Sequence, residues 1–387
     1  MDIGKKTFIW AIVGLIILRI MLMILMMNNI PFTGMKDGGF RPTFSESYQP
    51  DEPEFYRMIK GLASGKIEKS VPNIGAPIVF VPFMYFSGAN SPDELAKSIF
   101  VLEAFVLFSL ALILVALTAR KLFDSRKWAA ASAALFTVYP WILLTFFKII
   151  GYKNAIPAFH YQLWIFILSD YLSAFWVYLS FFMIFRWFND LFEATDIKVR
   201  NLIILAAASG AALLTRVGNF WLVLIIAAAF LFFKKFKNAG LYFLALFVMY
   251  LPQAVFNFLV FGAPWRYGYR DKALASTASG LLDVWFNPLN LLKNFQKFSP
   301  DYYILLAAAF CLVAAAIFIF GYKYFVKINK PFAVISSAWF WSYLIFYGLF
   351  DESMGQLRYF LPAIPVFIYF FIAALVYLSD ILKEKYV

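Results

Sequence analysis

The sequence predicts an all-α, polytopic membrane protein with about ten transmembrane helices. Hydrophobic residues make up 63% of the 387 residues and charged residues only 14%, whereas an ordinary soluble domain carries roughly 25% charged residues. Apolar runs recur along the whole chain, and the short loops on alternate sides of them are basic. We therefore expect one integral membrane domain over 1–387.

The apolar runs define the expected helices. A helix that crosses the hydrocarbon core needs about 20 apolar residues. Long runs lie at 7–29, 95–118, 128–147, 161–185, 240–261, 303–321, 332–350 and 359–381. The first run lacks a small-residue cleavage site and is interpreted as a retained span. Two shorter runs, 201–215 and 219–233, are joined by Arg216-Val217-Gly218 and are typical of a tight helical hairpin.

The charge of the loops orients the chain. If Lys5 and Lys6 lie in the cytoplasm, every short loop on that side is basic, as the positive-inside rule requires. Those segments are 120–127, 186–200, 234–237, 323–330 and 383–385. The segments 30–94 and 262–302 then become long outer loops. The run at 74–86 contains Pro and Gly, so we place it as an interfacial or re-entrant piece, and both termini are expected in the cytoplasm.

The first outer loop contains an amphipathic pattern. Apolar residues at helical spacing predict an interfacial helix that begins near Glu52; they are Phe55, Met58, Ile59, Leu62 and Ala63. Asp51 and Glu52 would start this helix at the outer membrane surface, where an enzyme acting on lipid-linked substrates needs its acid and base groups. The alternative is that Asp51 only caps the helix, with Glu54 in the capping-box position.

Charged residues also fall within the apolar runs. Each costs at least about 2.5–3.5 kcal/mol at the centre of a membrane helix. Counting about 1.5 Å per residue from the helix ends places them in the outer half of the membrane; they are Arg19, Glu103, Asp170 and Arg216. One polar cavity that opens outward would explain the set. The alternative is internal ion pairing, for example of Arg19 with Glu103 or with Asp170.

Composition excludes several kinds of site. A single cysteine, Cys311, excludes an intramolecular disulfide bond and a cysteine metal cluster. His160 is the only histidine, so any metal would be held by carboxylates and water. The net charge of +12 is dispersed through many short loops, which favours membrane lipids with anionic headgroups and phosphate-bearing substrates over nucleic acid.

Four segments, in order along the chain, resemble motifs of the GT-C superfamily of membrane glycosyltransferases. The similar branch contains the protein O-mannosyltransferases and the lipid A aminoarabinose transferases. The segments are Pro50-Asp51-Glu52 with Leu62-Ala63-Ser64-Gly65, then Leu213-Leu214-Thr215-Arg216, then Asn257 to Pro264 with Gly268-Tyr269, and finally Arg358 to Pro365. The chain departs from the pattern at Phe55, where the family has a tyrosine that appears here as Tyr56, and it is short for the superfamily.

The resemblance implies inverting transfer of a sugar, a hexose such as mannose, from a polyprenyl-phosphate donor to a hydroxyl acceptor on the extracytoplasmic face. The acceptor would be a protein, a lipid or a glycan. Asp51 would be the general base, and Glu52 would orient the base or the acceptor. Positive charge for the leaving phosphate would come from Arg216 and Arg358. The expected substrate-binding residues are Tyr56, Asp170, Tyr269, Asp351 and Glu352.

Two questions stay open at this point. Some GT-C enzymes use a divalent ion bound by first-loop carboxylates, whereas the similar branch does not need one; we favour a reaction without metal or other cofactor. A lipid or lipid-linked sugar transporter would also explain charges within the membrane, although transporters usually show repeated halves with broken helices near the midplane. A non-catalytic scaffold would have little reason to keep such charges.

Overall fold

The computed structural model describes residues 2–27, 52–69, 73–149, 169–193, 198–266, 268, 290, 303–349 and 357–386. In these ranges the regular structure is entirely helical. The helices are α1 (Lys5–Met27), α2 (Glu52–Ala63), α3 (Gly75–Ser87), α4 (Pro92–Val101), α5 (Phe108–Phe123), α6 (Arg126–Ile149), α8 (Asp170–Arg186), α9 (Val199–Thr215), α10 (Phe220–Phe232), α11 (Phe236–Phe261), α15 (Tyr303–Ile328), α16 (Lys330–Leu349) and α17 (Ile364–Tyr386).

Every apolar run that predicted a span contains a helix. Within the described ranges, five helical segments are long and apolar enough to cross a membrane: Glu94–Phe123, Phe236–Phe261, Cys311–Ile328, Lys330–Leu349 and Tyr359–Glu384. The predicted hairpin is present as α9 and α10, which are joined by a short 3₁₀ turn at Val217–Asn219. The chain is therefore a multi-pass membrane protein, and the count of ten spans stays a prediction.

The longest of these segments begins with two capping hydrogen bonds. Ser91 accepts a hydrogen bond from the backbone nitrogen of Glu94 at 3.3 Å, and the Glu94 carboxylate accepts one from the backbone nitrogen of Asn90 at 2.7 Å. This reciprocal pair satisfies two donors at the start of α4. The helix continues through a π-helical segment, Leu102–Leu107, into α5 and ends at Asp124, which adopts a left-handed conformation with φ of 47°.

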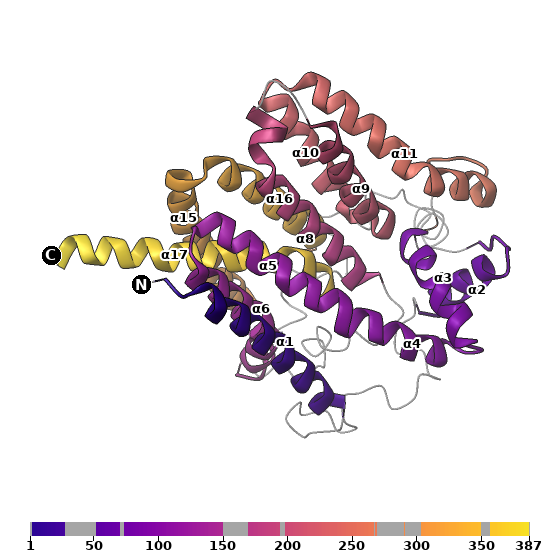
Figure 1. Cartoon of the computed structure of the whole chain (residues 1–387), viewed down its shortest axis with the longest axis horizontal. Helices are drawn as coiled ribbons and strands as arrows, with labels where there is room; N and C mark the ends of the chain where they lie inside the picture. The colour runs from indigo at the N-terminus through magenta and orange to yellow at the C-terminus, as the bar shows by residue number, and fades with distance from the viewer. Residues whose placement is uncertain are drawn as a thin grey trace.

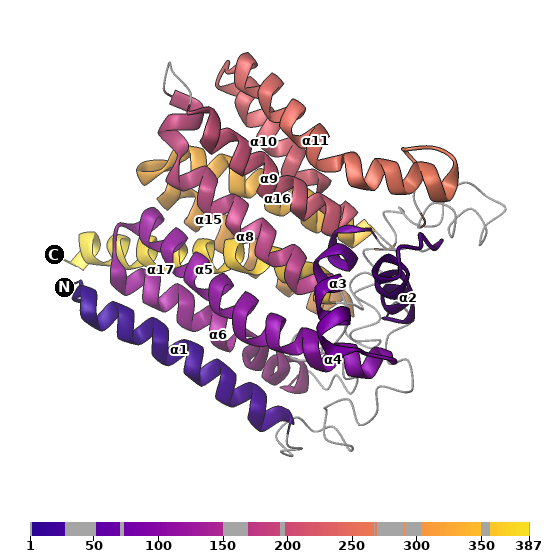
Figure 2. The ribbon, with the colours of Figure 1, turned by 45° about the vertical axis from the view of Figure 1, so that its right-hand side comes forward.

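The amphipathic pattern that begins near Glu52 lies in helix α2, whose place at the membrane surface stays a prediction. Phe55, Met58 and Ile59 are 4%, 1% and 0% exposed, because α2 packs against α3 and α4. The run placed as an interfacial or re-entrant piece forms α3, a helix that continues through Pro82 and ends at Gly88. These helices lie together at one end of the molecule (Figures 1 and 2).

The turns that carry the predicted cytoplasmic lysines gather at the opposite end of the bundle. The Asp2 carboxylate accepts hydrogen bonds from the Ser125 hydroxyl at 3.1 Å and from the backbone nitrogen of Lys127 at 3.0 Å. The Lys235 ammonium donates to the Glu193 carbonyl at 3.2 Å. The start of α1 and the end of α17 lie at this end (Figure 1). Which membrane face it occupies stays a prediction.

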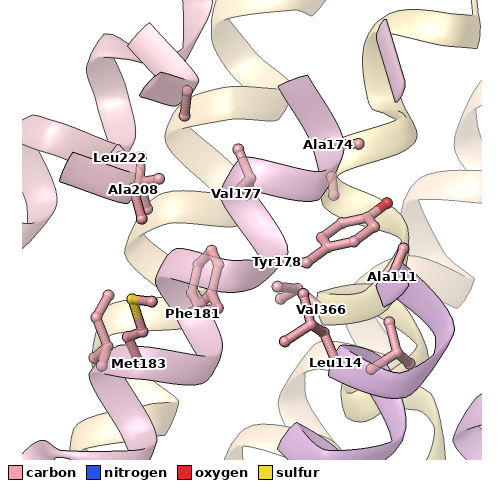
Figure 3. Packing of buried hydrophobic residues seen from close by; sticks show 14 of the residues in the cluster. Ala111, Leu114, Ala174, Val177, Tyr178, Phe181, Met183, Ala208, Leu222 and Val366 are labelled. Atoms are coloured by element: carbon pink, nitrogen blue, oxygen red, sulfur yellow. The ribbon is translucent and has the colours of Figure 1, made fainter. Parts of the chain in front are cut away.

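Helix α8 is central to the core. It packs against α5, α9 and the 3₁₀ segment Leu357–Ala363 that precedes α17. Its Tyr178 hydroxyl donates to the Leu361 carbonyl at 2.5 Å, and its Phe181 meets Trp339 edge-on with ring centroids 4.9 Å apart. Figure 3 shows side chains of α8 meeting those of α5, α9, α10 and α17. Because α8 begins with Asp170, this packing also positions a charged group.

Candidate functional site: an arginine held by a carboxylate and a tyrosine ring

Asp170 and Arg216 form a buried ion pair. Asp170 is the first residue of α8, and Arg216 directly follows α9 in an extended conformation with φ of −151°. Their Oδ1 and Nη1 atoms are 2.5 Å apart, and the side chains are 2% and 14% exposed, respectively. The packing of α8 on α9 therefore brings together two charged residues that are distant in the sequence. These were two of the predicted site residues.

Burial explains why the two charges lie together. An isolated charge in a low-dielectric interior is unfavourable, so buried charges are paired. The first turn of a helix also stabilises a carboxylate, because its backbone N–H groups carry partial positive charge. A guanidinium has five N–H donors in a fixed fork, and the contact with Asp170 uses one of them. The arrangement can hold Arg216 in place while it binds an anion.

An aromatic surface completes the arrangement. The Arg216 guanidinium carbon lies 4.4 Å from the centroid of the Tyr359 ring, a cation–π geometry. The Tyr347 ring stacks on Tyr359 with centroids 5.2 Å apart, and the Tyr343 hydroxyl donates to the Tyr359 carbonyl at 2.9 Å. Helix α16 therefore fixes Tyr359, which supports the guanidinium. We call Asp170, Arg216 and Tyr359 the Arg216 site.

The hairpin turn is fitted closely to its neighbours. A Cβ atom at Gly218 would overlap the hydroxyl of Tyr347, so only glycine leaves room for that phenol. The next residue, Asn219, donates from Nδ2 to the Ser173 hydroxyl and to the Ala212 carbonyl, both at 2.8 Å. These bonds tie the turn that carries Arg216 to α8 and to the end of α9.

The start of α3 is attached to the same hairpin. Asn73 donates from Nδ2 to the Leu213 carbonyl at 3.1 Å, and the backbone nitrogen of Ile74 donates to Oε1 of Gln253 at 2.9 Å. A Cβ atom at Gly75 would lie 2.6 Å from the backbone carbonyl carbon of Leu214. We call the contacts of 73–75 with α9 and α11 the α3 clasp. It connects the segment before α3 directly to the backbone that leads into Arg216.

The other intramembrane charges are not part of this ion pair. Arg19 donates to the Thr137 carbonyl at 3.2 Å and lies over the rings of Phe108 and Trp141, each centroid 5.0 Å away. The salt bridge given for Asp170 is made by Arg216, and the suggested ion pairing of Arg19 stays a prediction. Glu103 is fully buried in the π-helical segment, and neither carboxyl oxygen has a hydrogen-bond partner among the described residues.

Tyr56 lies on α2, away from the Arg216 site in sequence and in its contacts. Its hydroxyl is 3.5 Å from the Ala89 carbonyl, and the Lys60 ammonium lies 5.8 Å from its ring centroid. Burial, and next the negative charge of Glu94, raise the pKa of Tyr56 above its ordinary value. Its phenol is therefore a neutral hydrogen-bond donor at neutral pH.

The remaining predicted site residues are placed only in part. Asp51, Tyr269, Asp351 and Glu352 lie outside the described residues. The structure describes the backbone of two more: Glu52 begins α2, and Arg358 directly precedes Tyr359. Sequence reasoning missed three residues around Arg216, which are Tyr343, Tyr347 and Tyr359. A signal was available, because two tyrosines four residues apart share one helix face.

Comparison with solved structures identifies the fold. One similar structure is ArnT, a lipid A aminoarabinose transferase, from Cupriavidus metallidurans bound to undecaprenyl phosphate; the TM-score is 0.53 at 13% identity, covering 96% of this chain and 60% of that one. The oligosaccharyltransferase of Archaeoglobus fulgidus, tethered to an acceptor peptide, gives a TM-score of 0.50 at 13% identity, covering 97% and 50%. The oligosaccharyltransferase AglB of Archaeoglobus fulgidus, in complex with an inhibitory peptide and a dolichol-phosphate, gives a TM-score of 0.50 at 14% identity, covering 99% and 52%.

The chain therefore has the fold of GT-C glycosyltransferases. It spans about half to three fifths of the length of the proteins it matches. No protein-family model and no curated protein sequence matches it.

Proposed function

We propose that this protein is an inverting glycosyltransferase that moves a sugar from a polyprenyl-phosphate donor to a hydroxyl acceptor at the extracytoplasmic membrane face. The observation that carries this proposal is the Arg216 site, a buried and preorganised cation in the GT-C fold. The solved structures with this fold include one bound to undecaprenyl phosphate and one in complex with a dolichol-phosphate. A phosphate on a long isoprenoid is the matching ligand for such a cation.

In the proposed reaction Arg216 binds the phosphate that leaves. The acceptor oxygen attacks the anomeric carbon, the bond from that carbon to the phosphate oxygen breaks, and its electron pair remains on the phosphate. Asp170 and Tyr359 hold the guanidinium before the charge develops, so little reorganisation is needed in the transition state. The 14% exposure of Arg216, against 2% for Asp170, leaves the arginine as the accessible member of the pair.

The acceptor proton goes to a carboxylate in this scheme. We assign that role to Asp51, since it directly precedes α2, with Glu52 orienting the acceptor or the base. A general base must lie within about 3 Å of the proton that it removes. The α3 clasp supports the assignment, because it attaches the helices that follow Asp51 to the Arg216 hairpin.

The other sequence candidates have supporting roles in the proposal. Arg358 is a second cation for the phosphate, beside Tyr359. Asp351 and Glu352 hold Arg358 or contact the sugar, whereas Tyr269 and Tyr56 contribute further substrate contacts. We propose that the reaction needs no divalent ion, that the sugar is a hexose such as mannose, and that the acceptor is a protein, lipid or glycan.

The test is transfer or hydrolysis of radiolabelled polyprenyl-phosphate sugars by the purified protein in lipid nanodiscs, with and without EDTA. Asp51→Asn and Arg216→Gln are expected to lose turnover, whereas Asp190→Asn, which removes the partner of the exposed Lys198, is the matched control and keeps it. Near-normal turnover in Asp51→Asn would contradict the role of the base. Tight donor binding without turnover under any condition would favour a transporter.

A further inference from the structure

A groove away from the Arg216 site lies between α10 and α16. Its volume is about 430 Å³. Ile225, Ala228 and Phe232 line it from α10, and Val334 and Ala338 line it from α16. Every lining side chain is apolar except that of Lys330, the first residue of α16. The groove is open because alanines line it on both helices, and Lys330 lies at its edge.

The groove belongs to one leaflet of the membrane. Lys330 and Phe232 lie at the end of the bundle where the basic turns gather, and α10 and α16 pack against each other. From Lys330 to Ala338 the helix rises about 12 Å, which is less than the roughly 15 Å that one leaflet contributes to the hydrocarbon core. Arg216 precedes α10, whereas the lining residues of α10 begin at Ile225; the last of them, Phe232, is about 18 Å along the helix from its first residue, Phe220.

Size and charge select the occupant. The groove volume of about 430 Å³ equals about one turn of a helix 10 Å across, roughly 420 Å³, which is small for a partner helix. An acyl chain fits its narrow, apolar walls. Lys330 is exposed at the rim, and the exposed Lys234 follows Phe233, another lining residue. Cations at the membrane surface attract anionic lipid headgroups.

We propose that the α10–α16 groove binds the acyl chain of an anionic phospholipid, whose phosphate is held by Lys330. The lipid belongs to the leaflet on the side of the basic turns. This binding site is distinct from the proposed site of glycosyl transfer, because no residue of the Arg216 site lines the groove. The lipid bridges α10, which follows the turn that carries Arg216, and α16, which carries Tyr343 and Tyr347.

The first test measures lipid binding to the full chain. Detergent-purified protein is titrated with phosphatidylglycerol or with phosphatidylcholine, and bound lipid is counted by native mass spectrometry. One lysine near the surface contributes about 1 kcal/mol, or about fivefold in affinity. Lys330→Gln should therefore weaken phosphatidylglycerol binding about fivefold and leave phosphatidylcholine binding unchanged. Lys383→Gln, an exposed lysine on the tail of α17, is the matched control and should change neither.

The second test fills the groove. Ala338 faces outward from the bundle, so Ala338→Phe should block the acyl chain without disturbing the core, and it should lower binding of both lipids. Ala309→Phe, at an exposed alanine of α15, is the control for an added ring. A photoreactive acyl chain of phosphatidylglycerol should crosslink to α10 and α16.

Three results would overturn the proposal: crosslinks elsewhere, equal loss of both lipids in Lys330→Gln, or unchanged binding in a folded Ala338→Phe variant. Retention of a polyprenyl phosphate in this groove in place of the phospholipid would also overturn it. Thermal melting of each variant shows that it is folded.

Discussion

Replacing Asp170 with asparagine removes the charge that faces Arg216 but keeps the size of the side chain. Two unit charges about 4 Å apart attract by about 4 kcal/mol at the effective dielectric of 20 that suits protein sites. Breaking a buried pair by removing one partner typically costs about 3–5 kcal/mol, because the other charge is left without compensation. Since the asparagine can still accept a hydrogen bond, we expect Asp170→Asn to lower the free energy of unfolding by about 3 kcal/mol.

A double-mutant cycle isolates the pair from other effects. Asp170→Asn, Arg216→Gln and the double variant are unfolded reversibly in mixed detergent and SDS micelles. The double variant should be less destabilised than the sum of the single variants, with a coupling energy of about 2–3 kcal/mol. In the same preparations, sugar transfer should fall about 10²- to 10³-fold in Asp170→Asn, the loss typical of a missing electrostatic stabiliser.

The exposed pair of Lys198 and Asp190 is the internal control. Its atoms are 3.2 Å apart, but its side chains are 69% and 30% exposed. Surface ion pairs contribute about 0–1 kcal/mol, so the cycle of Asp190→Asn with Lys198→Gln should give a small coupling energy. A coupling energy at the buried pair no larger than at this exposed pair would refute the reasoning from burial.

Gly218→Ala should destabilise the protein by about 1–3 kcal/mol through overpacking. Adding Tyr347→Phe to that variant should restore part of the lost stability, because it removes the overlapping hydroxyl. Melting temperatures of both variants test this, and an absence of rescue in the double variant would contradict the overlap. Glu103→Met should leave the free energy of unfolding unchanged or raise it by about 1–3 kcal/mol, because the Glu103 carboxyl oxygens are buried without partners among the described residues. A clearly lower melting temperature in this variant would show that the carboxyl group stabilises the fold. The backbone N–H of Lys127 holds the pKa of Asp2 below its ordinary value of 3.8. Asp2 therefore stabilises the fold above that value, and the advantage of wild type over Asp2→Ala in melting temperature should vanish as the pH falls through the folded-state pKa.

The helices could be predicted because their signals are local. The apolar runs of α5 and α11 and the stripe of α2 each lie in one continuous segment, and period and length are enough to identify them. The placement of Asp170 and Arg216 in the outer half of the membrane rests on counting residues along their helices and stays a prediction.

The partners of the charged groups could not be predicted in the same way. Arg19, Asp170 and Arg216 were all candidates for pairing, and only the packing of α8 on α9 selects Arg216 for Asp170. Tyr359 lies in the segment Arg358 to Pro365 that resembles a family motif. Its position beside the Arg216 guanidinium depends on α16 and on a contact between residues 143 positions apart in the sequence. Hydropathy reports burial and carries no information about which buried group faces which.

The α3 clasp shows how such contacts organise the proposed site. Gly75 allows α3 to approach the end of α9 at a distance that any side chain would prevent, and Asn73 and Gln253 fix the register of that approach. A base and a phosphate-binding arginine must act on the two ends of one bond, and a misplacement of about 1 Å can cost about a hundredfold in rate. Because Asp51 precedes α2 and Arg216 follows α9, the clasp is the described contact that can hold the two at a constant separation.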